Sequence, residues 1–380
     1  MVLAGFVHGR NLEVAPLSAD EREMQAQAQT LKESHGHDVE GRMLPLFLQS
    51  GQDRWLAPLP VYASALVAAL APSPPVHVRW VAAAFGLADI ALIFVLANRC
   101  FRDPEAGLAA ALALLITPAH VLFSRSAVAD GIWPLPFILA WAIGLTALAE
   151  RPASSTRWLF AAGTGSLAAL VYAQASAALL VPGLALVTMR CFSRATSWRP
   201  ADAIPAVATT AGVLLALFVW LVRFAETQAR PFALWLLLPA DARSMFRAST
   251  ILKTFWDFWL PSHLFLKPDV PGLCAMFLVA MAVPIAVGLY ASMRHGAHED
   301  GLAEGMREPV MAVCLLGPLV AATATQAPSD GRALVVVPFG VLFAVWGVIR
   351  MRRDFGIVGR LLLGVLVLGA AVQAALCFQW

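Results

Sequence analysis

Charged residues are scarce in this sequence. Asp, Glu, Lys and Arg make up 13% of its 380 residues, whereas soluble domains contain roughly 25%. Hydrophobic residues account for 59%, and the mean hydropathy is +0.72. This composition excludes a soluble globular protein and predicts an integral membrane protein. The net charge of +3 is small and implies no nucleic-acid partner.

The alternation of polar and apolar residues that is typical of membrane β-barrels is absent. Instead, several apolar stretches approach or exceed the ~18 residues that cross a bilayer as a helix. The predicted fold class is all-α, a polytopic membrane protein with about ten transmembrane helices. We place them at 77–98, 105–123, 131–149, 158–173, 175–190, 203–224, 272–292, 309–326, 331–349 and 357–378. Residues 158–190 would also fit one long bent helix, and 58–72 predicts a short interfacial helix.

Metal-binding spacings, obvious disulfide pairs and internal repeats are also lacking. The five cysteines match no metal motif. His37, Asp38 and Glu40 supply one imidazole and two carboxylates, which is weak evidence for a metal site, so a solvated, salt-bridged turn is the favoured interpretation. The sequence predicts no certain cofactor and leaves assistance by a divalent metal open.

Arginines are distributed unevenly between alternate connections of the predicted spans. Cytoplasmic loops are enriched in Lys and Arg. The short loops of one set hold only Arg125 and Arg332, whereas the other set holds twelve arginines. These twelve are Arg99, Arg102, Arg151, Arg157, Arg190, Arg194, Arg199, Arg294, Arg307, Arg350, Arg352 and Arg353. We therefore expect a bacterial inner (plasma) membrane protein whose arginine-poor loops face the periplasm.

This orientation divides the chain into four parts. They are an outer catalytic loop with interfacial helices at 1–72, a transmembrane module at 73–224, a long outer loop at 225–271 and further transmembrane helices at 272–380.

An N-terminus outside the cell needs a segment that carries residues 1–57 across the membrane. Met1–Val7 lacks the basic n-region and full h-region of a signal peptide. We expect it to be the end of a first transmembrane helix that is missing from the chain.

The N-terminal outer loop contains a dense set of acids and bases. Asp20 and Glu21 precede a run of helix formers that ends at Lys32, so we expect Ser18 or Asp20 to cap a helix there. The pattern fits a capped surface helix and equally a carboxylate that takes a proton from an acceptor hydroxyl or orients it. Asp53 alone would usually be a turn residue, but a second acid beside it would make an acid/base pair.

Several short motifs in this loop and the following spans form a pattern. They are Pro16-Leu-Ser-Ala-Asp20-Glu21; Gly36-His-Asp38-Val-Glu40-Gly41-Arg42 with Pro45; Gly51-Gln-Asp53 with Pro58-Leu-Pro60-Val-Tyr62; Arg79; Arg99-Cys-Phe101; and Pro118 to Ser124-Arg125 with Asp130. The pattern resembles the dolichyl-phosphate-mannose protein mannosyltransferase-like family. That family belongs to the GT-C glycosyltransferases, as do the lipid A aminoarabinose transferases. The resemblance weakens after about residue 190.

The resemblance implies an inverting glycosyltransferase of the hexosyl- or mannosyltransferase type. Its donor would be a polyprenyl-phosphate sugar, and its acceptor a protein, a lipid or a glycan in contact with membrane lipid. By this resemblance Asp20 is the catalytic base or the carboxylate that orients the acceptor. Glu21 completes the acidic pair, and Asp53 is the second loop acid. Family members usually begin with a transmembrane helix before the acidic pair and often extend further at the C-terminus.

A lipid-phosphate donor needs cations beside the bilayer to hold the phosphate that leaves. Arg125 is the preferred candidate because it and Asp130 close a short outer turn, where the alternative is a simple salt bridge between them. For each basic candidate, a position at the membrane surface with the charge in water is the alternative. The predicted substrate-binding residues are Arg125, Arg332, Asp130, His263, Lys267 and Tyr62.

Two other functions stay open at this point. Asp89 is a carboxylate inside an apolar span, where such a group normally faces a partner or a cavity, and it fits equally a protonated residue that packs between helices. Transporters and lipid flippases also place ionisable residues inside their spans. Transporters, however, often contain inverted repeats, and this sequence shows one clear acid within a span and no repeat. The missing first span would also fit a truncated, inactive transferase. The sequence identifies neither the sugar nor the acceptor.

Overall fold

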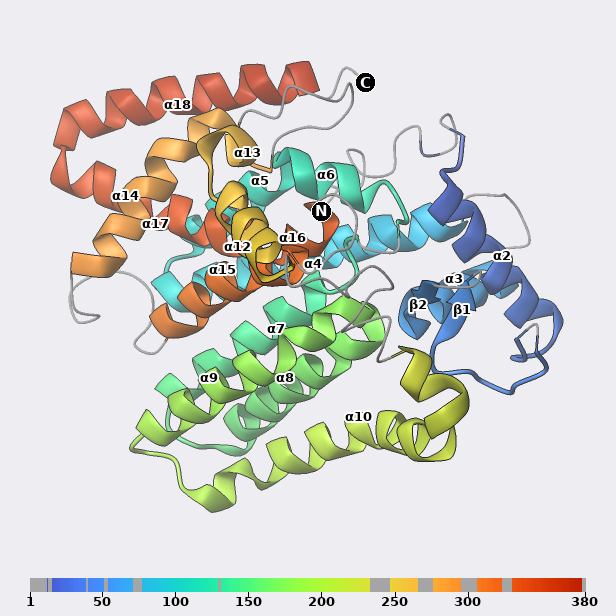
Figure 1. Ribbon diagram of the computed structural model, residues 1–380. Coiled ribbons are helices and arrows are strands. Elements are labelled where there is room, and N and C mark those ends of the chain that lie inside the picture. The colour runs from blue at the N-terminus through green and yellow to red at the C-terminus, as the bar shows by residue number, and fades with distance from the viewer. Residues whose placement is uncertain are drawn as a thin grey trace.

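The computed structural model describes residues 12, 16–38, 40–50, 54–70, 77–128, 131–232, 247–265, 276–294, 306–322 and 330–377. These residues are almost entirely helical, and the strands among them form one two-stranded sheet. Figure 1 shows the long helices side by side in one bundle, with α2, α3 and the hairpin gathered at its right-hand end.

The N-terminal unit contains two helices and a hairpin. Its elements are α2 (Ala19–Glu33), β1 (Leu48–Ser50), β2 (Arg54–Leu56) and α3 (Pro58–Leu70). Both helices form where the sequence predicts them, and the antiparallel hairpin was not anticipated. α2 buries Met24, Ala28 and Leu31, whose spacing places them on one helical face, and it packs against α3. This contact holds α2 beside the start of the next helix.

Within the described residues, each predicted span coincides with one helix or with two or three consecutive helical segments. They are α4 (His77–Phe101); α5 (Pro104–Leu115) with α6 (Pro118–Ser124); α7 (Leu135–Thr146) with η1 (Ala147–Ala149); α8 (Ser154–Ala173); η2 (Ala175–Leu179) with α9 (Val181–Arg194); η3 (Pro200–Ala203) with α10 (Ile204–Arg223); η5 (Val279–Met281) with α14 (Ala282–Arg294); α15 (Arg307–Ala322); α16 (Asp330–Ala333), η6 (Leu334–Val336) and α17 (Val337–Asp354); and α18 (Gly356–Cys377). The helix breaks at Gln174, so 158–190 is two helices rather than one long helix. The shorter elements η4 (Ala225–Ala229), α12 (Arg247–Phe258) and α13 (Pro261–Phe265) follow α10.

The apolar helices satisfy the length requirement for a membrane to different degrees. Within the described residues, four helices are long and apolar enough to cross alone, at 77–101, 200–223, 331–354 and 356–373. The pair α5–α6 would form a fifth span, bent by 66°. Only 11% of the apolar stretch of α10 or α18 is buried, against 89% for the helix that contains α17. A bilayer would cover the apolar surfaces that α10 and α18 expose.

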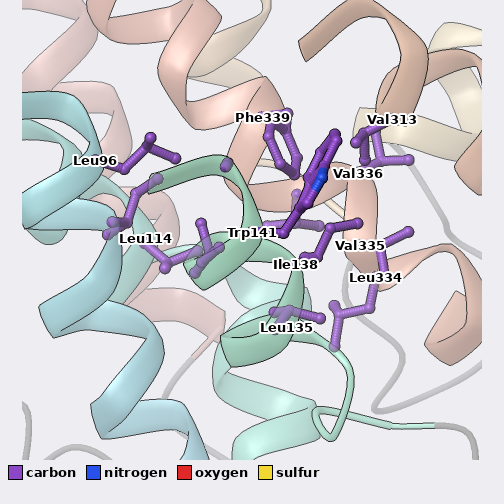
Figure 2. Close-up of a cluster of buried hydrophobic side chains, with 14 of the residues drawn as sticks. Leu96, Leu114, Leu135, Ile138, Trp141, Val313, Leu334, Val335, Val336 and Phe339 are labelled. Atoms are coloured by element: carbon purple, nitrogen blue, oxygen red, sulfur yellow. The ribbon is translucent and has the colours of Figure 1, made fainter. Parts of the chain in front are cut away.

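The core lies between α4, α5, α7 and α17. Figure 2 shows Trp141 and Ile138 of α7 facing Val336 and Phe339, with Leu114 of α5 nearby. These side chains are buried, and they fix the relative positions of helices that are far apart in the sequence.

Polar contacts between helix ends separate into two groups. At one end, Arg99 binds Glu150 at 2.5 Å, and Arg157 binds Asp202 at 2.7 Å. The Trp198 indole N–H also donates to the backbone oxygen of Glu150 at 2.9 Å. The other end of α4 contacts α2. The arginine-rich connections therefore gather at one end of the bundle, which we call the arginine-rich end, and α2 lies at the opposite end.

Candidate active site

A capping box at the start of α2 positions the acidic pair. The Oγ atom of Ser18 accepts a hydrogen bond from the Glu21 N–H at 3.2 Å, and the Ser18 N–H donates to Glu21 Oε2 at 2.8 Å. These reciprocal bonds begin the helix at Ala19. Asp20 therefore lies in the first turn, where the positive end of the helix dipole favours a carboxylate. Its side chain is partly buried.

Glu21 is almost completely buried and binds two other segments of the chain. Its Oε1 atom accepts hydrogen bonds from Arg79 Nε at 2.7 Å and from the Ala127 N–H at 3.1 Å. Its Oε2 atom accepts one from Arg79 Nη2 at 2.8 Å. Arg79 belongs to α4, and Ala127 lies between α6 and α7. We call Ser18, Glu21, Arg79 and Ala127 the Glu21 cluster, which joins α2, α4 and the segment after α6.

The electrostatic balance of the cluster keeps Glu21 ionised. Burial by itself would raise the pKa of this carboxyl, but the hydrogen bonds from Arg79 and from two backbone N–H groups outweigh burial and lower the pKa to about 2. A carboxylate with so low a pKa is a weak base at neutral pH. Glu21 is therefore well placed to hold neighbouring groups, whereas Asp20 faces partly outward.

Arg79 extends the cluster toward the segment that precedes α2. Its Nη1 atom donates to the Leu12 backbone oxygen at 2.7 Å, and Nη2 donates to the Pro16 oxygen at 2.9 Å. A planar guanidinium suits such a set of acceptors, because its donors point in several fixed directions. The entry of the chain into α2 is thus fixed by the same side chain that neutralises Glu21.

The cluster brings two predicted site residues to the same region. Asp20 adjoins Glu21, and Arg125 is the C-cap of α6, two residues before Ala127. The hydrogen bond from Ala127 to Glu21 therefore brings the segments that carry Asp20 and Arg125 together, although they are far apart in the sequence. Arg125 is also partly buried. In general a carboxylate can accept a proton, and a guanidinium can hold an anion.

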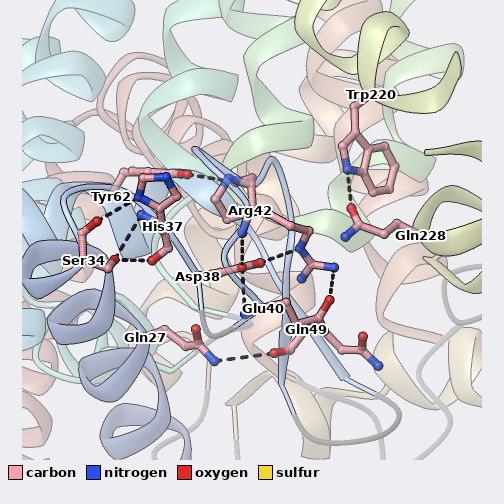
Figure 3. Close-up of polar contacts among 11 residues, drawn as sticks. Gln27, Ser34, His37, Asp38, Glu40, Arg42, Gln49, Tyr62, Trp220 and Gln228 are labelled. Carbon is pink, nitrogen blue, oxygen red and sulfur yellow. Dashed lines mark hydrogen bonds and ion pairs between the residues drawn. The ribbon is translucent and has the colours of Figure 1, made fainter. Parts of the chain in front are cut away.

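The turn that contains His37 is stabilised by ion pairs, as the favoured interpretation predicts. Asp38 Oδ2 accepts a hydrogen bond from Arg42 Nε at 2.6 Å, and Glu40 pairs with Arg42 Nη1 at 2.5 Å (Figure 3). Across the described residues, no group of three or more His, Cys, Asp or Glu could hold a metal ion.

Tyr62 of α3 binds the segment that follows this turn. Its hydroxyl donates to the Pro45 backbone oxygen at 2.9 Å. Burial and the nearby negative charge of Asp38 raise the pKa of Tyr62 to about 12, so the hydroxyl keeps its proton at neutral pH. The structure therefore places Tyr62 as a support of the outer loop.

An aromatic cluster holds the hairpin against the end of α10. Phe47 stacks on Phe232 with ring centroids 4.3 Å apart, and Trp55 meets Phe232 edge-on at 5.7 Å. The Trp220 indole N–H donates to Gln228 Oε1 at 2.9 Å (Figure 3). Three predicted site residues lie outside the described residues: Asp53, Asp130 and Lys267.

Arg332 and His263 lie on elements grouped around α15. Arg332 belongs to α16, which packs against α15, and it is partly buried. His263 belongs to α13, and its ring packs against Phe258 of α12 with centroids 5.3 Å apart. α12 also packs against α15. The helix that carries Arg332 and the helix against which His263 packs therefore both contact α15.

Two buried ion pairs were not anticipated from the sequence. Arg79 entered only as part of a motif, although an arginine in the first turn of an apolar span signals a need for a partner. His120 was not singled out, and it lies 3.5 Å from Asp89, Nε2 to Oδ2, with both side chains fully buried. Asp89 therefore faces a polar partner, which is one of the possibilities that its position in an apolar span left open.

Comparisons with known proteins identify the fold. No family model and no curated protein matches the chain. Similar solved structures include ArnT from Cupriavidus metallidurans bound to undecaprenyl phosphate, with 15% identity and a TM-score of 0.63 over 98% of this chain and 62% of that one. The oligosaccharyltransferase AglB from Archaeoglobus fulgidus, in complex with an inhibitory peptide and a dolichol-phosphate, has 10% identity and a TM-score of 0.58 over 99% of this chain and 54% of that one.

The arabinosyltransferase EmbB from Mycobacterium smegmatis is also similar, with 15% identity and a TM-score of 0.53 over 91% of this chain and 30% of that one. All three are GT-C glycosyltransferases, so the chain has the GT-C fold, which confirms the predicted fold class. It spans 62% of the length of ArnT and smaller shares of the other two.

Proposed function

We propose that this chain acts as a membrane glycosyltransferase of the GT-C type. It moves a sugar from a polyprenyl-phosphate donor to an acceptor at the periplasmic face of a bacterial inner membrane, with inversion at the anomeric carbon. The observation that carries the proposal is the position of Asp20 beside the Glu21 cluster and close to the segment of Arg125, on a GT-C fold. The undecaprenyl phosphate bound to ArnT and the dolichol-phosphate bound to AglB support a donor of this class.

In the proposed reaction Asp20 accepts the proton of the acceptor hydroxyl or orients that hydroxyl. The acceptor oxygen forms a bond to the anomeric carbon as the bond from that carbon to the phosphate oxygen breaks. The electron pair of the broken bond stays on the phosphate, which leaves as a lipid phosphate without needing a proton. A positioned carboxylate typically contributes about 10²–10⁴-fold to such a step.

Arg125 is the preferred residue to stabilise the phosphate. Its charge would become more important as negative charge builds on the leaving oxygens. Arg332, His263 and Lys267 would contribute from the α15 side and the long outer loop, with Asp130 orienting Arg125. Asp53 would act as the second loop acid, and Glu21 would position Asp20 rather than exchange protons, because its carboxylate is already bonded.

Replacing Asp20 with Asn tests the proposal. The amide keeps the size of the side chain but removes the negative charge and the basicity, so we expect transfer to fall at least about 100-fold. Sugar transfer from defined polyprenyl-phosphate sugars, measured on membranes that contain the full-length gene product, gives the rate. Mass spectrometry of the product identifies the sugar and the acceptor.

Glu23→Gln is the matched control. Glu23 is a partly buried acid one turn further along α2, so its replacement removes the same charge from the same helix. We expect transfer by this variant to stay near the wild-type rate. Unchanged transfer by Asp20→Asn, with normal insertion into the membrane, would overturn the assignment of Asp20.

A further inference from the structure

α6 contacts α4 at successive levels along the bundle. At the middle of α4, His120 of α6 faces Asp89, the central residue of that helix. One turn nearer the Glu21 cluster, the helices approach so closely that a Cβ atom on Gly86 would lie 2.5 Å from the Ser124 Cβ. Beyond the end of α6, Ala127 binds Glu21, which also binds Arg79 of α4. The three levels align α6 along α4.

The deepest level is a polar pair with no exposure to solvent. Asp89 and His120 are both 0% exposed, and the distance from Nε2 to Oδ2 is 3.5 Å. Among the described residues, neither carboxylate oxygen of Asp89 makes a hydrogen bond. An isolated carboxylate that is completely buried is strongly unfavourable. The imidazole compensates, because the pair is neutral overall whether the proton lies on the ring or on the carboxyl.

α6 depends on its contacts with α4 for its position. The helix has seven residues, far fewer than the about 12–15 needed for a helix that is stable by itself. It also follows a 66° bend after α5, at Thr117 and Pro118. Neither its direction nor its depth is therefore set by continuation of α5. Tertiary contacts set both, and Arg125 is the C-cap residue of this helix.

We propose that the Asp89–His120 pair is a positioning element that holds α6 against α4 and thereby places Arg125 beside Asp20. Its consequence for catalysis rests on the proposed function, since Arg125 is there the phosphate-binding residue. The pair itself does not touch the substrate. Loss of His120 leaves the Asp89 carboxylate buried without this ionic contact, loss of Asp89 removes the same contact, and α6 then moves away from α4.

Cysteine labelling tests the structural part without reference to catalysis. Ser126→Cys, in a background without the native cysteines, places a thiol directly after Arg125 in a partly buried position. We expect Asp89→Leu and His120→Leu each to increase its rate of reaction with a maleimide severalfold. Thr188→Val is the control, because it removes a buried hydroxyl that binds Trp141 in another helix pair and should leave the rate unchanged.

The double variant Asp89→Leu/His120→Leu distinguishes loss of the contact between these two residues from general destabilisation of the protein. An apolar pair leaves no buried charge, so its labelling rate should lie closer to the parent than that of either single variant. Single variants that label at the parent rate, or a double variant whose effect equals the two single effects combined, would overturn the proposal.

The transfer assay tests the catalytic part. We expect each single variant to lower kcat/KM for the lipid-phosphate donor about 10-fold, mainly through KM, because a displaced Arg125 weakens phosphate binding. The double variant should recover part of this loss. If labelling follows the expected pattern while the parent protein transfers no sugar, the pair positions α6 and the proposed function fails. A loss confined to kcat would contradict the link to Arg125.

Discussion

At the scale of single residues, the two adjacent acids of α2 have different environments. Glu21 takes part in five hydrogen bonds, two with Ser18, two with Arg79 and one with the Ala127 N–H, whereas Asp20 remains partly accessible. The capping box requires an acid or amide at the position of Glu21, three residues after Ser18. Neighbouring carboxylates can therefore serve separate roles.

The low pKa of Glu21 predicts how stability depends on pH. The folded value of about 2 lies below the ordinary value of 4.5, so the ionised carboxylate stabilises the folded state above pH 4.5. This contribution, about 3 kcal/mol, is lost as the pH falls from 4.5 through 2. Thermal unfolding of the purified protein in detergent at several pH values between 7 and 3 measures the decline.

Two variants distinguish the titration of Glu21 from the titration of other carboxyl groups. Glu21→Gln should be less stable than the parent at pH 7 and should lose less stability on acidification, because its side chain does not titrate. Glu33→Gln, at the exposed far end of α2, should reproduce the parent profile. Parallel profiles for Glu21→Gln and the parent would show that Glu21 is not the group responsible.

At the scale of elements, short helices depend on close contact with longer ones. α6 approaches α4 at Gly86, where the absence of a side chain allows Ser124 to pack directly against the α4 backbone. Similarly, Gly144 and Gly163 let α7 and α8 approach, since a Cβ atom on Gly144 would lie 2.6 Å from the Gly163 Cα. Small residues at helix contacts are typical of membrane proteins, where close packing of backbones drives association.

Gly86→Ala tests the close approach of α4 and α6. The added Cβ atom would lie 2.5 Å from the Ser124 Cβ, so the helices must separate, at a cost of about 1–3 kcal/mol. The thermal unfolding temperature measures the loss. Adding Ser124→Gly should recover part of it, because the colliding atom is removed.

Gly212→Ala is the matched control in α10. A Cβ atom there would meet nothing within 4 Å, and alanine favours a helix over glycine by about 0.5–1 kcal/mol, so stability should be unchanged or higher. Equal unfolding temperatures for Gly86→Ala and Gly212→Ala would contradict the tight α4–α6 contact.

At the scale of the whole molecule, the bundle has two chemically distinct ends. The arginine-rich end carries short ion pairs between neighbouring connections, such as Arg99 with Glu150 and Arg190 with Glu308. The opposite end carries the N-terminal unit and the candidate active site. Because positive charge is retained in the cytoplasm, this asymmetry predicts that the candidate site faces the periplasm.

Labelling of intact cells tests this orientation. We expect a cysteine at Ala26, exposed on α2, to react with a membrane-impermeant maleimide in cells with an opened outer membrane. A cysteine at Arg151, exposed at the arginine-rich end, should react only after the inner membrane is permeabilised. Both variants would be made in a background without native cysteines. The reverse pattern would place the candidate site on the cytoplasmic side.

The sequence alone determined the positions of the helices. Length and hydropathy of a segment are local properties, so every predicted span coincides with a helix or broken helix, and Ser18 marks the start of α2 as expected. The hairpin at 48–56 was missed because each strand has three residues and is stabilised by distant aromatic side chains such as Trp220 and Phe232.

Only the tertiary structure decided which polar residues meet. α4 is apolar on all sides, so its sequence does not indicate which face Arg79 or Asp89 presents to a neighbour. Their partners, Glu21 and His120, lie on α2 and on α6, and α6 is separated from α5 by a 66° bend. A buried charge requires a partner, and sequence predicts that requirement. The identity of the partner follows only from how the helices are arranged in space.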